Sequence, residues 1–529
     1  MQDSAVDWQN LTIPRAVFLA AERFPDRSAI EDGDVRLTFA DLADAALGAA
    51  RAFVDAGIER GDRVAIWAPN IAEWVIAAIG AQMAGAAIVP MNTRFKAAEA
   101  GYALRKSGAR LLCTVGDFLG VDYAASLAGE ELPALREIVT LRGTSAAATP
   151  WRDFLARGAR TPIAHARERS LAVSPRDLSD LLFTSGTTGY PKAVMTEHGQ
   201  NLRVFDVWSR GAGIRAGDRY LVVNPFFHSF GYKAGWLACI QRGATIVPHA
   251  VFDPSAVLER IGKERISVLP GPPSLYQALL AHPDRAKYDL SALRVAVTGA
   301  APVPVELVNR MRAELGFEIV LTAYGLTESS GTVSMCLQTD DAETISTTSG
   351  RPIPGVEVRC VGPDGREVPR GEAGEIHVRG YNVMRGYLDD PAETAKTIDP
   401  EGWLHTGDVG VMDARGYLRI TDRIKDLYIY SGFNCYPAEI ENLMYRNAGI
   451  AQVAVVGVPD EKMGEVGMAF VVARPGAELT PDGVIAWCRE NMANYKVPRR
   501  VEILPALPKN ASGKVLKYEL RQRGAAGRA

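Results

Sequence analysis

Residues 181–192, Leu-Leu-Phe-Thr-Ser-Gly-Thr-Thr-Gly-Tyr-Pro-Lys, join a short apolar run to a loop rich in hydroxyl groups. The run Leu181–Phe183 predicts a buried strand. The two glycines that follow permit positive φ, so that backbone N–H groups can converge on an anion. We expect the stretch to bind phosphate at the end of a strand of an α/β fold, through Thr184, Ser185, Gly186, Thr187, Thr188, Gly189 and Lys192.

Two other interpretations of this loop are weaker. A surface turn rich in Gly, Ser and Thr is common, but the density of donors and the closing lysine favour phosphate binding. A Walker A loop requires Ser or Thr after its lysine, whereas Ala193 follows Lys192, and the glycine spacing also differs.

Length and composition limit the class of protein. A chain of 529 residues predicts three or four units of ordinary domain size. The 59 basic and 62 acidic residues give a net charge of −3, which argues against a general attraction to nucleic acid or to an anionic membrane. The six cysteines form no Cys-x-x-Cys pair, so neither a disulfide framework nor a zinc site is expected from them.

Targeting signals are not predicted. Met1–Asp7 is acidic and lacks the basic-then-apolar order of a signal peptide. Residues 74–91 are long and apolar, but Gly85 and Pro90 interrupt them, so we expect a buried helix followed by a buried strand at 86–89. The sequence predicts a cytoplasmic protein with no integral membrane segment.

Strands and helical patterns alternate through the first 345 residues, which predicts parallel βαβ units. Ligands of such sheets bind beyond the carboxyl ends of the strands, and a turn of small or polar residues follows each strand predicted after residue 178. We therefore expect one cleft. The strands are predicted at 181–183, 220–223, 268–270, 295–297 and 318–321.

The pattern changes after residue 350. Short antiparallel strands at 356–360 and 374–380 are separated by a Pro-Asp-Gly turn and predict a third, smaller subdomain. Residues 426–529 contain a helix-like segment at 437–443 and strand-like segments at 453–458 and 468–472. They predict a compact α+β module with a basic tail.

The loop at 181–192 resembles the nucleotide-binding loop of the adenylate-forming superfamily, which includes acyl-CoA synthetases, peptide-synthetase adenylation domains and firefly luciferases. The order of the later motifs matches this superfamily across nearly the whole chain, although Ala193 stands where the family usually has Gly. The resemblance implies a large N-terminal domain, residues 1–424, of layered α/β subdomains with a small β-barrel-like subdomain. It also implies a small, mobile α+β C-terminal domain, residues 425–529.

The resemblance implies sites for ATP and Mg²⁺. Tyr324 would stack on the adenine and Glu328 would hold the metal, although Tyr324 could be a core aromatic and Glu328 a solvated acid at a helix start. Asp408 would bind the ribose hydroxyls and Arg423 the ribose and phosphate end. The other nucleotide contacts implied are Gly299, Ala300, Ala301, Gly325 and Thr327.

The resemblance also implies how the two domains would work. Lys514 would be catalytic during adenylation, together with Thr184, and Lys425 would be the hinge about which the small domain rotates. Gly432 would lie against the pantetheine tunnel of coenzyme A. His228 would gate the acyl and CoA channel, although a core histidine is the alternative.

The detailed similarity is strongest to actinobacterial CoA ligases that act on the propionate side arm of a partly degraded sterol ring system. It spans residues 224–254, 268–280 and 322–331. The expected partners are a carboxylic acid, ATP and CoA, in a possible homodimer. The acid pocket is predicted from Phe227, Tyr232, Lys233 and Trp236, with Lys233 meeting a substrate carbonyl.

Two alternatives to this function are open. One is a CoA ligase for medium-chain or aromatic acids. The other is a non-catalytic nucleotide-binding regulator, which would be expected to have lost Lys514, Glu328 or Asp408, and all three are present.

Overall fold

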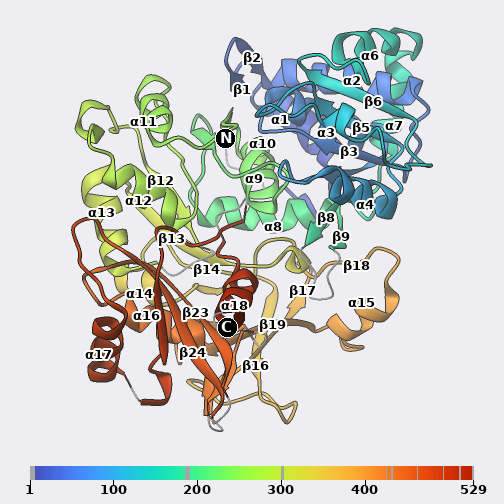
Figure 1. Cartoon of the computed structure of the whole chain (residues 1–529). Coiled ribbons are helices and arrows are strands. Elements are labelled where there is room, and N and C mark those ends of the chain that lie inside the picture. Colours follow the sequence, from blue (N-terminus) through green and yellow to red (C-terminus); the bar gives the residue numbers. More distant parts are fainter. Residues whose placement is uncertain are drawn as a thin grey trace.

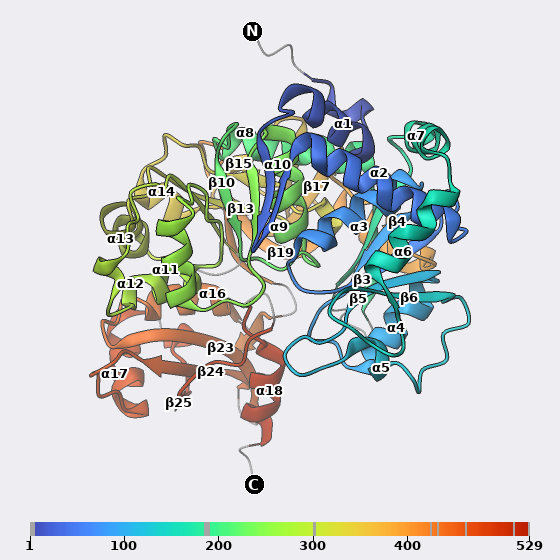
Figure 2. The ribbon, with the colours of Figure 1, turned by 90° about the horizontal axis from the view of Figure 1, so that it is seen from above.

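The computed structural model describes residues 6–184, 191–299, 303–423, 426–430, 433–460, 463–492, 494–510 and 514–526. Figure 1 shows the parts in chain order: an N-terminal α/β part in blue and teal, a second α/β part in green and yellow, a small β subdomain in gold and light orange, and a C-terminal part in darker orange and red. Figure 2 shows the C-terminal part set against one side of the rest.

The first sheet has eight strands in the order β18-β9-β8-β4-β3-β5-β6-β7. The strands from β8 to β7 pair in parallel, whereas β9 and β18 are antiparallel additions at one edge. In that order, the bounds are Gly386–Tyr387, Lys192–Glu197, Leu178–Thr184, Ala87–Pro90, Arg63–Trp67, Leu111–Val115, Glu137–Arg142 and Thr149–Pro150.

Helices cover this sheet, and the sequence explains where they begin. The side chain of Thr38 accepts a hydrogen bond from the Asp41 backbone, and the Asp41 carboxylate accepts one from the Thr38 backbone, so a capping box starts α2. Helix α3 is buried on almost every side, and β4 follows it, as the apolar stretch at 74–91 predicts. The helices of this part are Ile13–Arg23 (α1), Phe39–Asp55 (α2), Ala72–Met83 (α3), Ala97–Ser107 (α4), Tyr123–Ser126 (α5), Trp151–Arg157 (α6) and Ile163–Ala172 (α7).

The second α/β part has two rows of strands, β10-β11-β1-β2 and β12-β13-β14-β15. Val268 bridges β10 and β12 and so joins the rows. The strand predicted at 268–270 is reduced to this bridge, because prolines at 270, 272 and 273 cannot donate to a ladder. The strands are Ser28–Asp32 (β1), Val35–Thr38 (β2), Arg219–Val222 (β10), Thr245–Pro248 (β11), Val295–Thr298 (β12), Ile319–Tyr324 (β13), Ser334–Met335 (β14) and Arg351–Pro352 (β15).

The helices of this second part surround the strands (Figure 1). One π-helical turn, Tyr232–Leu237, interrupts the chain between α9 and α10. The helices are His198–Gly211 (α8), Ser229–Gly231 (α9), Ala238–Arg242 (α10), Pro254–Lys263 (α11), Pro273–Ala281 (α12), Val305–Leu315 (α13) and Ala342–Thr347 (α14).

A four-stranded antiparallel sheet, β16-β17-β19-β20, forms the predicted small subdomain. The strands are Val356–Val361 (β16), Ala373–Gly380 (β17), Leu404–Met412 (β19) and Leu418–Arg423 (β20), and helix α15 spans Pro391–Thr397. Between Glu375 and His377 of β17 the register with β19 shifts, because β19 carries extra residues there.

The C-terminal part has a five-stranded sheet of its own, in which β24 pairs with β21, β23 and β25. Its hydrophobic core, from Tyr428 to Leu520, is separate from the large core that runs from Trp8 to Leu418. The elements are Tyr428–Tyr430 (β21), Phe433–Cys435 (β22), Pro437–Met444 (α16), Ile450–Asp460 (β23), Gly464–Ala473 (β24), Pro481–Asn491 (α17), Arg500–Ile503 (β25) and Lys517–Ala526 (α18).

Two further observations concern whole classes of residue. All six cysteines are buried and free, as their scattered positions predict. Within the described ranges, no helix combines the length and the apolar character that crossing a membrane requires.

Candidate active site

The predicted phosphate loop joins two antiparallel strands, β8 and β9. Thr184 ends β8 and is the register partner of Lys192, which begins β9. The Lys192 ammonium forms an ion pair with Glu393 of α15 and lies 5.0 Å from the centre of the Tyr387 ring. The lysine at the start of β9 is therefore held by Tyr387 of the neighbouring edge strand β18 and by Glu393 of α15.

A glycine follows each of two neighbouring strands, β12 and β13, at a position where a side chain would not fit. A Cβ atom at Gly299, directly after β12, would lie 2.9 Å from the Ala323 carbonyl oxygen. At Gly325, directly after β13, it would lie 2.3 Å from the Gly331 carbonyl oxygen. Both distances are too short for a real contact, so the close approach of these backbones requires glycine.

Tyr324 and Asp408 meet although 84 positions separate them. The Tyr324 hydroxyl donates a hydrogen bond of 2.7 Å to Oδ2 of Asp408. Tyr324 ends β13, and Asp408 is a buried residue of β19. The structure thus brings the predicted adenine and ribose residues together from different subdomains.

Glu328 belongs to a short 3-10 turn, Thr327–Ser329, that follows β13. The Tyr387 hydroxyl donates a hydrogen bond of 3.0 Å to Glu328 Oε1. Burial raises the pKa of the Tyr387 phenol beyond its ordinary range, and the neighbouring Glu328 carboxylate raises it further. Tyr387 therefore stays protonated and acts as a donor that orients the carboxylate.

His228 is the N-cap residue of α9. Its Nδ1 accepts a hydrogen bond of 3.2 Å from the Phe230 backbone, which leaves Nε2 for other partners. The side chain reaches solvent, yet the surrounding protein disfavours a charged ring. This desolvation, with the charge of Lys514 as a second cause, lowers the pKa of His228 to about 4. His228 is a neutral imidazole at physiological pH.

Lys514, the predicted catalytic lysine, belongs to the C-terminal part. Two hydrogen bonds of 2.8 Å hold its backbone: its N–H donates to the Asn510 side chain, and its carbonyl accepts from the Asn510 backbone. Its side chain is exposed. Its charge contributes to the lowered pKa of His228, so the two side chains lie within electrostatic range of each other.

The structure corrects the predicted acid pocket. Tyr232, Lys233 and Trp236 are completely buried, so they do not line an open cleft; of the predicted set, Phe227 is partly exposed. Lys233 does not meet a substrate carbonyl, because its ammonium lies 3.1 Å from Asp180 Oδ1 and donates to Thr196 at 2.9 Å.

The aromatic rings of this π-helical turn pack in the core instead. Tyr232 and Trp236 are stacked with their centroids 4.8 Å apart, and Trp74 of α3 lies 6.3 Å from Tyr232 and 6.1 Å from Trp236. Through this aromatic packing, the π-helical turn of the second α/β part contacts α3 of the first part.

Several predicted residues lie outside the described ranges, namely Ser185, Gly186, Thr187, Thr188, Gly189, Ala300, Ala301, Lys425 and Gly432. For Arg423 the structure describes the backbone, which pairs with Asp408 across β19 and β20. These assignments stay predictions.

Three residues of the site escaped the sequence analysis: Asn70, Tyr387 and Glu393. Asn70 Nδ2 donates to the carbonyls of Val222 and Asn224, both at 2.9 Å, and its Oδ1 accepts from the Phe226 backbone at 2.7 Å. This asparagine thus fixes the turn that leads to His228. A lone Asn, Tyr or Glu carries no local signal, because each acts on a partner far away in the chain.

Models of two protein families match the chain. The family described as AMP-binding enzyme matches residues 17–388, and the AMP-binding enzyme C-terminal domain matches residues 439–514. The chain belongs to the AMP-binding enzyme family. The adenylate-forming fold expected from the resemblance is confirmed.

Two relatives within the AMP-binding enzymes are 52% identical to this chain. The similarity to a Rhodococcus jostii protein extends over 520 residues, 97% of this chain and 99% of the relative. A Mycobacterium tuberculosis protein matches over 513 residues with the same coverage. Both are named 3-[(3aS,4S,7aS)-7a-methyl-1,5-dioxo-octahydro-1H-inden-4-yl]propanoyl:CoA ligase. The expected enzyme class, an AMP-forming acid–thiol ligase, is confirmed.

Solved structures of other AMP-binding enzymes share the whole fold. An anthranilate CoA ligase in complex with anthranoyl-AMP superposes with a TM-score of 0.88 at 26% identity, covering 98% of each chain. The ATP-bound MatB of Rhodopseudomonas palustris gives a TM-score of 0.85 at 27% identity, covering 97% of this chain and 99% of that one.

Proposed function

We propose that this enzyme attaches coenzyme A to 3-(7a-methyl-1,5-dioxo-octahydro-inden-4-yl)propanoate, a propionate carried on a steroid-derived ring pair. The observation that carries the proposal is the 52% identity, over nearly the full length of both chains, to two ligases named for this product. A medium-chain acyl-CoA ligase of Danio rerio is 32% identical, which makes the medium-chain alternative the weaker one.

The chemistry explains the composition of the cleft. A carboxylate has no good leaving group, so its oxygen first attacks the α-phosphorus of ATP, which forms an acyl adenylate and releases pyrophosphate. Negative charge builds on the phosphate oxygens, and the residues that face it carry donors and positive charge. We assign Lys514, Thr184 and Thr327 to this task, with Lys192 at the outer phosphates.

The nucleoside part would lie where Tyr324 and Asp408 meet. Gly299 and Gly325 let the backbone segments at these strand ends pack closely against each other, since a Cβ atom at either position would meet neighbouring backbone. The Asp408 carboxylate offers paired acceptors to the ribose hydroxyls, and the Tyr324 hydroxyl orients it.

Mg²⁺ fits the donor set at Glu328. A hard cation takes carboxylate and phosphate oxygens together, and Tyr387, which donates to one oxygen of Glu328, also lies against Lys192. The ion would neutralise phosphate charge. Tyr387 and Glu328 would hold its position in the cleft, while Glu393 restrains Lys192.

The second half-reaction requires a different arrangement. The thiol of CoA attacks the acyl carbonyl, and AMP leaves. Because Lys514 occupies the cleft beside His228, we propose that residues 425–529 rotate about Lys425 to admit the pantetheine, with Gly432 then lining its path. Neutral His228 would border the channel. That the enzyme forms a homodimer stays a prediction. Analytical ultracentrifugation would test it by measuring the mass of the particle in solution.

A panel of acids tests the substrate. AMP release that depends on CoA would be measured for the indane-dione propanoate, its primary amide as a control without an acid, and straight-chain acids of increasing length. We expect the ring-bearing acid to have the highest kcat/KM. A rate that rises steadily with chain length, with no turnover of the ring-bearing acid, would overturn the assignment.

A further inference from the structure

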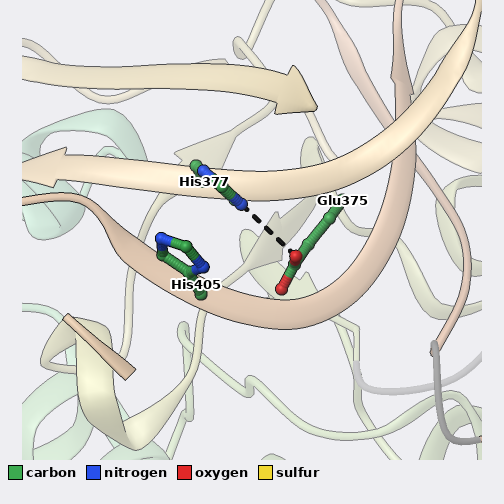
Figure 3. A group of neighbouring side chains, drawn as sticks. All are labelled: Glu375, His377 and His405. Carbon is green, nitrogen blue, oxygen red and sulfur yellow. Dashed lines mark hydrogen bonds and ion pairs between the residues drawn. The ribbon is translucent and has the colours of Figure 1, made fainter. Parts of the chain in front are cut away.

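Three metal-ligating side chains gather on the small subdomain, beside the nucleotide cleft. Glu375 and His377 are two residues apart on β17, so they share one face of the sheet. His405 of β19 is the register partner of His377. Figure 3 shows the three side chains lying together between the two strands.

The distances suit one small ion. Each residue offers a ligand atom, and the three atoms all lie within 4.8 Å of one another. His377 Nε2 and Glu375 Oε2 are 3.3 Å apart. That is long for an ion-pair hydrogen bond, but two ligands of a tetrahedral ion at about 2.0–2.1 Å lie roughly 3.3 Å apart.

Burial and a fourth residue support the same site. The side chain of His377 is only 6% exposed, and its Nδ1 has no hydrogen-bond partner among the described residues. His405 Nε2 lies 3.2 Å from Asp399 Oδ2. A carboxylate on one imidazole nitrogen leaves Nδ1 of His405 for a metal and fixes the tautomer, as is usual around metal-bound histidines.

We propose that Glu375, His377 and His405 bind a divalent transition-metal ion of the zinc class, and that the bound ion weakens ATP binding. Two imidazoles and one carboxylate favour Zn²⁺ or Co²⁺ over Mg²⁺, which prefers oxygen ligands only. The six cysteines do not compete, because all are buried.

One ring has to turn when the ion binds. The rings of His377 and His405 are stacked, with centroids 3.9 Å apart and planes 24° apart, whereas a metal lies in the plane of each ring that binds it. His405 can turn about its Cβ–Cγ bond, because its side chain is 35% exposed. His377 is enclosed and keeps its position.

The effect on ATP follows from the second oxygen of Glu375. Glu375 Oε1 accepts a hydrogen bond of 3.1 Å from the backbone of Gly407, which has φ +68° and lies in the irregular segment of β19. The next residue is Asp408. A metal that draws the carboxylate away would loosen this segment, and this consequence rests on the proposed ribose role of Asp408.

Binding is tested first, because it is independent of the proposed function. Purified, chelator-treated enzyme would be titrated with Co²⁺ and followed by the visible absorption of tetrahedral cobalt. We expect one ion per chain in the wild type and in the control His165→Ala, which removes an exposed histidine of α7. His377→Ala and His405→Ala should abolish the signal, and Asp399→Asn should weaken binding about 10- to 100-fold.

The wild type alone keeps the proposal testable if a variant fails to fold. Zn²⁺ should raise its thermal unfolding midpoint, and EDTA should reverse the rise. No cobalt signal in the wild type, or an equal signal in folded His377→Ala and His405→Ala, would overturn the site.

The effect on ATP is then measured as pyrophosphate release from acid and ATP with Mg²⁺ in excess and no CoA. Zn²⁺ should raise the KM for ATP several-fold in the wild type and in His165→Ala but not in His405→Ala. An unchanged KM in a wild type that binds the ion would refute the coupling, and inhibition of all variants alike would place the inhibitory ion elsewhere.

Discussion

Two lysines, Lys233 and Lys514, illustrate how differently one side chain is used in two regions of the molecule. Both are predicted from sequence to act in the cleft. Lys233 is fully enclosed and ion-paired with Asp180, whereas Lys514 is exposed on a loop held by Asn510. A charge that is paired and buried serves the fold, and only a charge that reaches the cleft can meet a substrate.

The pKa of Lys233 reflects the energetic cost of burying its charge. Desolvation lowers the pKa of Lys233 from its ordinary value, and the Asp180 carboxylate opposes this shift. Hydrogen bonds from Ser179, Thr196 and Asn201 satisfy the same aspartate. The pair and its network link β8 and β9 with the π-helical turn.

The largest effect is expected from a substitution that breaks the buried ion pair between Lys233 and Asp180. Lys233→Met should lower the free energy of unfolding by about 3–5 kcal/mol, because it leaves Asp180 buried and without its cation. Urea unfolding of the two variants Lys233→Met and Lys263→Met would measure this. Lys263 is the control, since its ion pair with Glu259 is exposed and such pairs contribute only about 0–1 kcal/mol.

A double variant then sharpens the result. Lys233→Met with Asp180→Leu should recover part of the loss, because no unpaired charge remains. Equal stability of Lys233→Met and wild type would show that the ion pair with Asp180 contributes nothing to the stability of the fold.

The exposed lysine should affect one reaction step and leave stability alone. Lys514→Ala should slow adenylation by at least about 10²–10³-fold, because it removes a charged donor from the developing charge. Pyrophosphate release from acid plus ATP would be compared with thioester formation from pre-made acyl adenylate plus CoA, which should stay near the wild-type rate.

The control for Lys514 is Lys263→Ala, which removes an exposed lysine of α11. If Lys514→Ala is folded, binds ATP and is equally slow in both assays, then the rotation of the C-terminal part does not apply to this enzyme.

A smaller effect on adenylation is expected from a substitution of Tyr387, whose hydroxyl donates a hydrogen bond to Glu328. Tyr387→Phe removes the hydrogen bond to Glu328 and keeps the ring beside Lys192, so adenylation should lose about 1.5–3 kcal/mol of stabilisation. The Mg²⁺ concentration for half-maximal adenylation should rise. Tyr417→Phe, which loses a bond to Asp340 away from the cleft, is the control and should not change it.

The smallest effect concerns the pKa of His228. Desolvation is the larger cause of its lowering to about 4 and Lys514 the smaller, so Lys514→Met should raise this pKa only in part. Titration of the imidazole by NMR would measure the change. An unchanged pKa would mean that the C-terminal part does not hold Lys514 beside His228 in solution.

The same pKa gives a pH dependence of stability with a definite sign. The folded state binds its proton at about 4 and the unfolded state near the ordinary 6.5, so stability is lost as the pH falls between these values. His228→Gln should reduce this acid sensitivity, as measured by thermal unfolding at pH 7 and pH 5.

Local patterns were enough for much of the fold. The apolar stretch at 74–91 predicts α3 and β4 because its burial is a property of the stretch itself. The glycines after β12 and β13 are required by the fold, since a Cβ atom at Gly299 or Gly325 would meet the backbone of a neighbouring segment. The strand expected at 268–270 was reduced by prolines that the sequence also contains.

By itself, the sequence determined the order of the elements and the family, because spacing and residue type are local properties. Only the tertiary structure decided that Lys233 pairs with Asp180, that Tyr387 orients Glu328 and that Asn70 fixes the turn before His228. Burial and hydrogen-bond geometry depend on segments that fold together from distant positions. The same type of side chain therefore becomes a structural or a reactive group according to what packs around it.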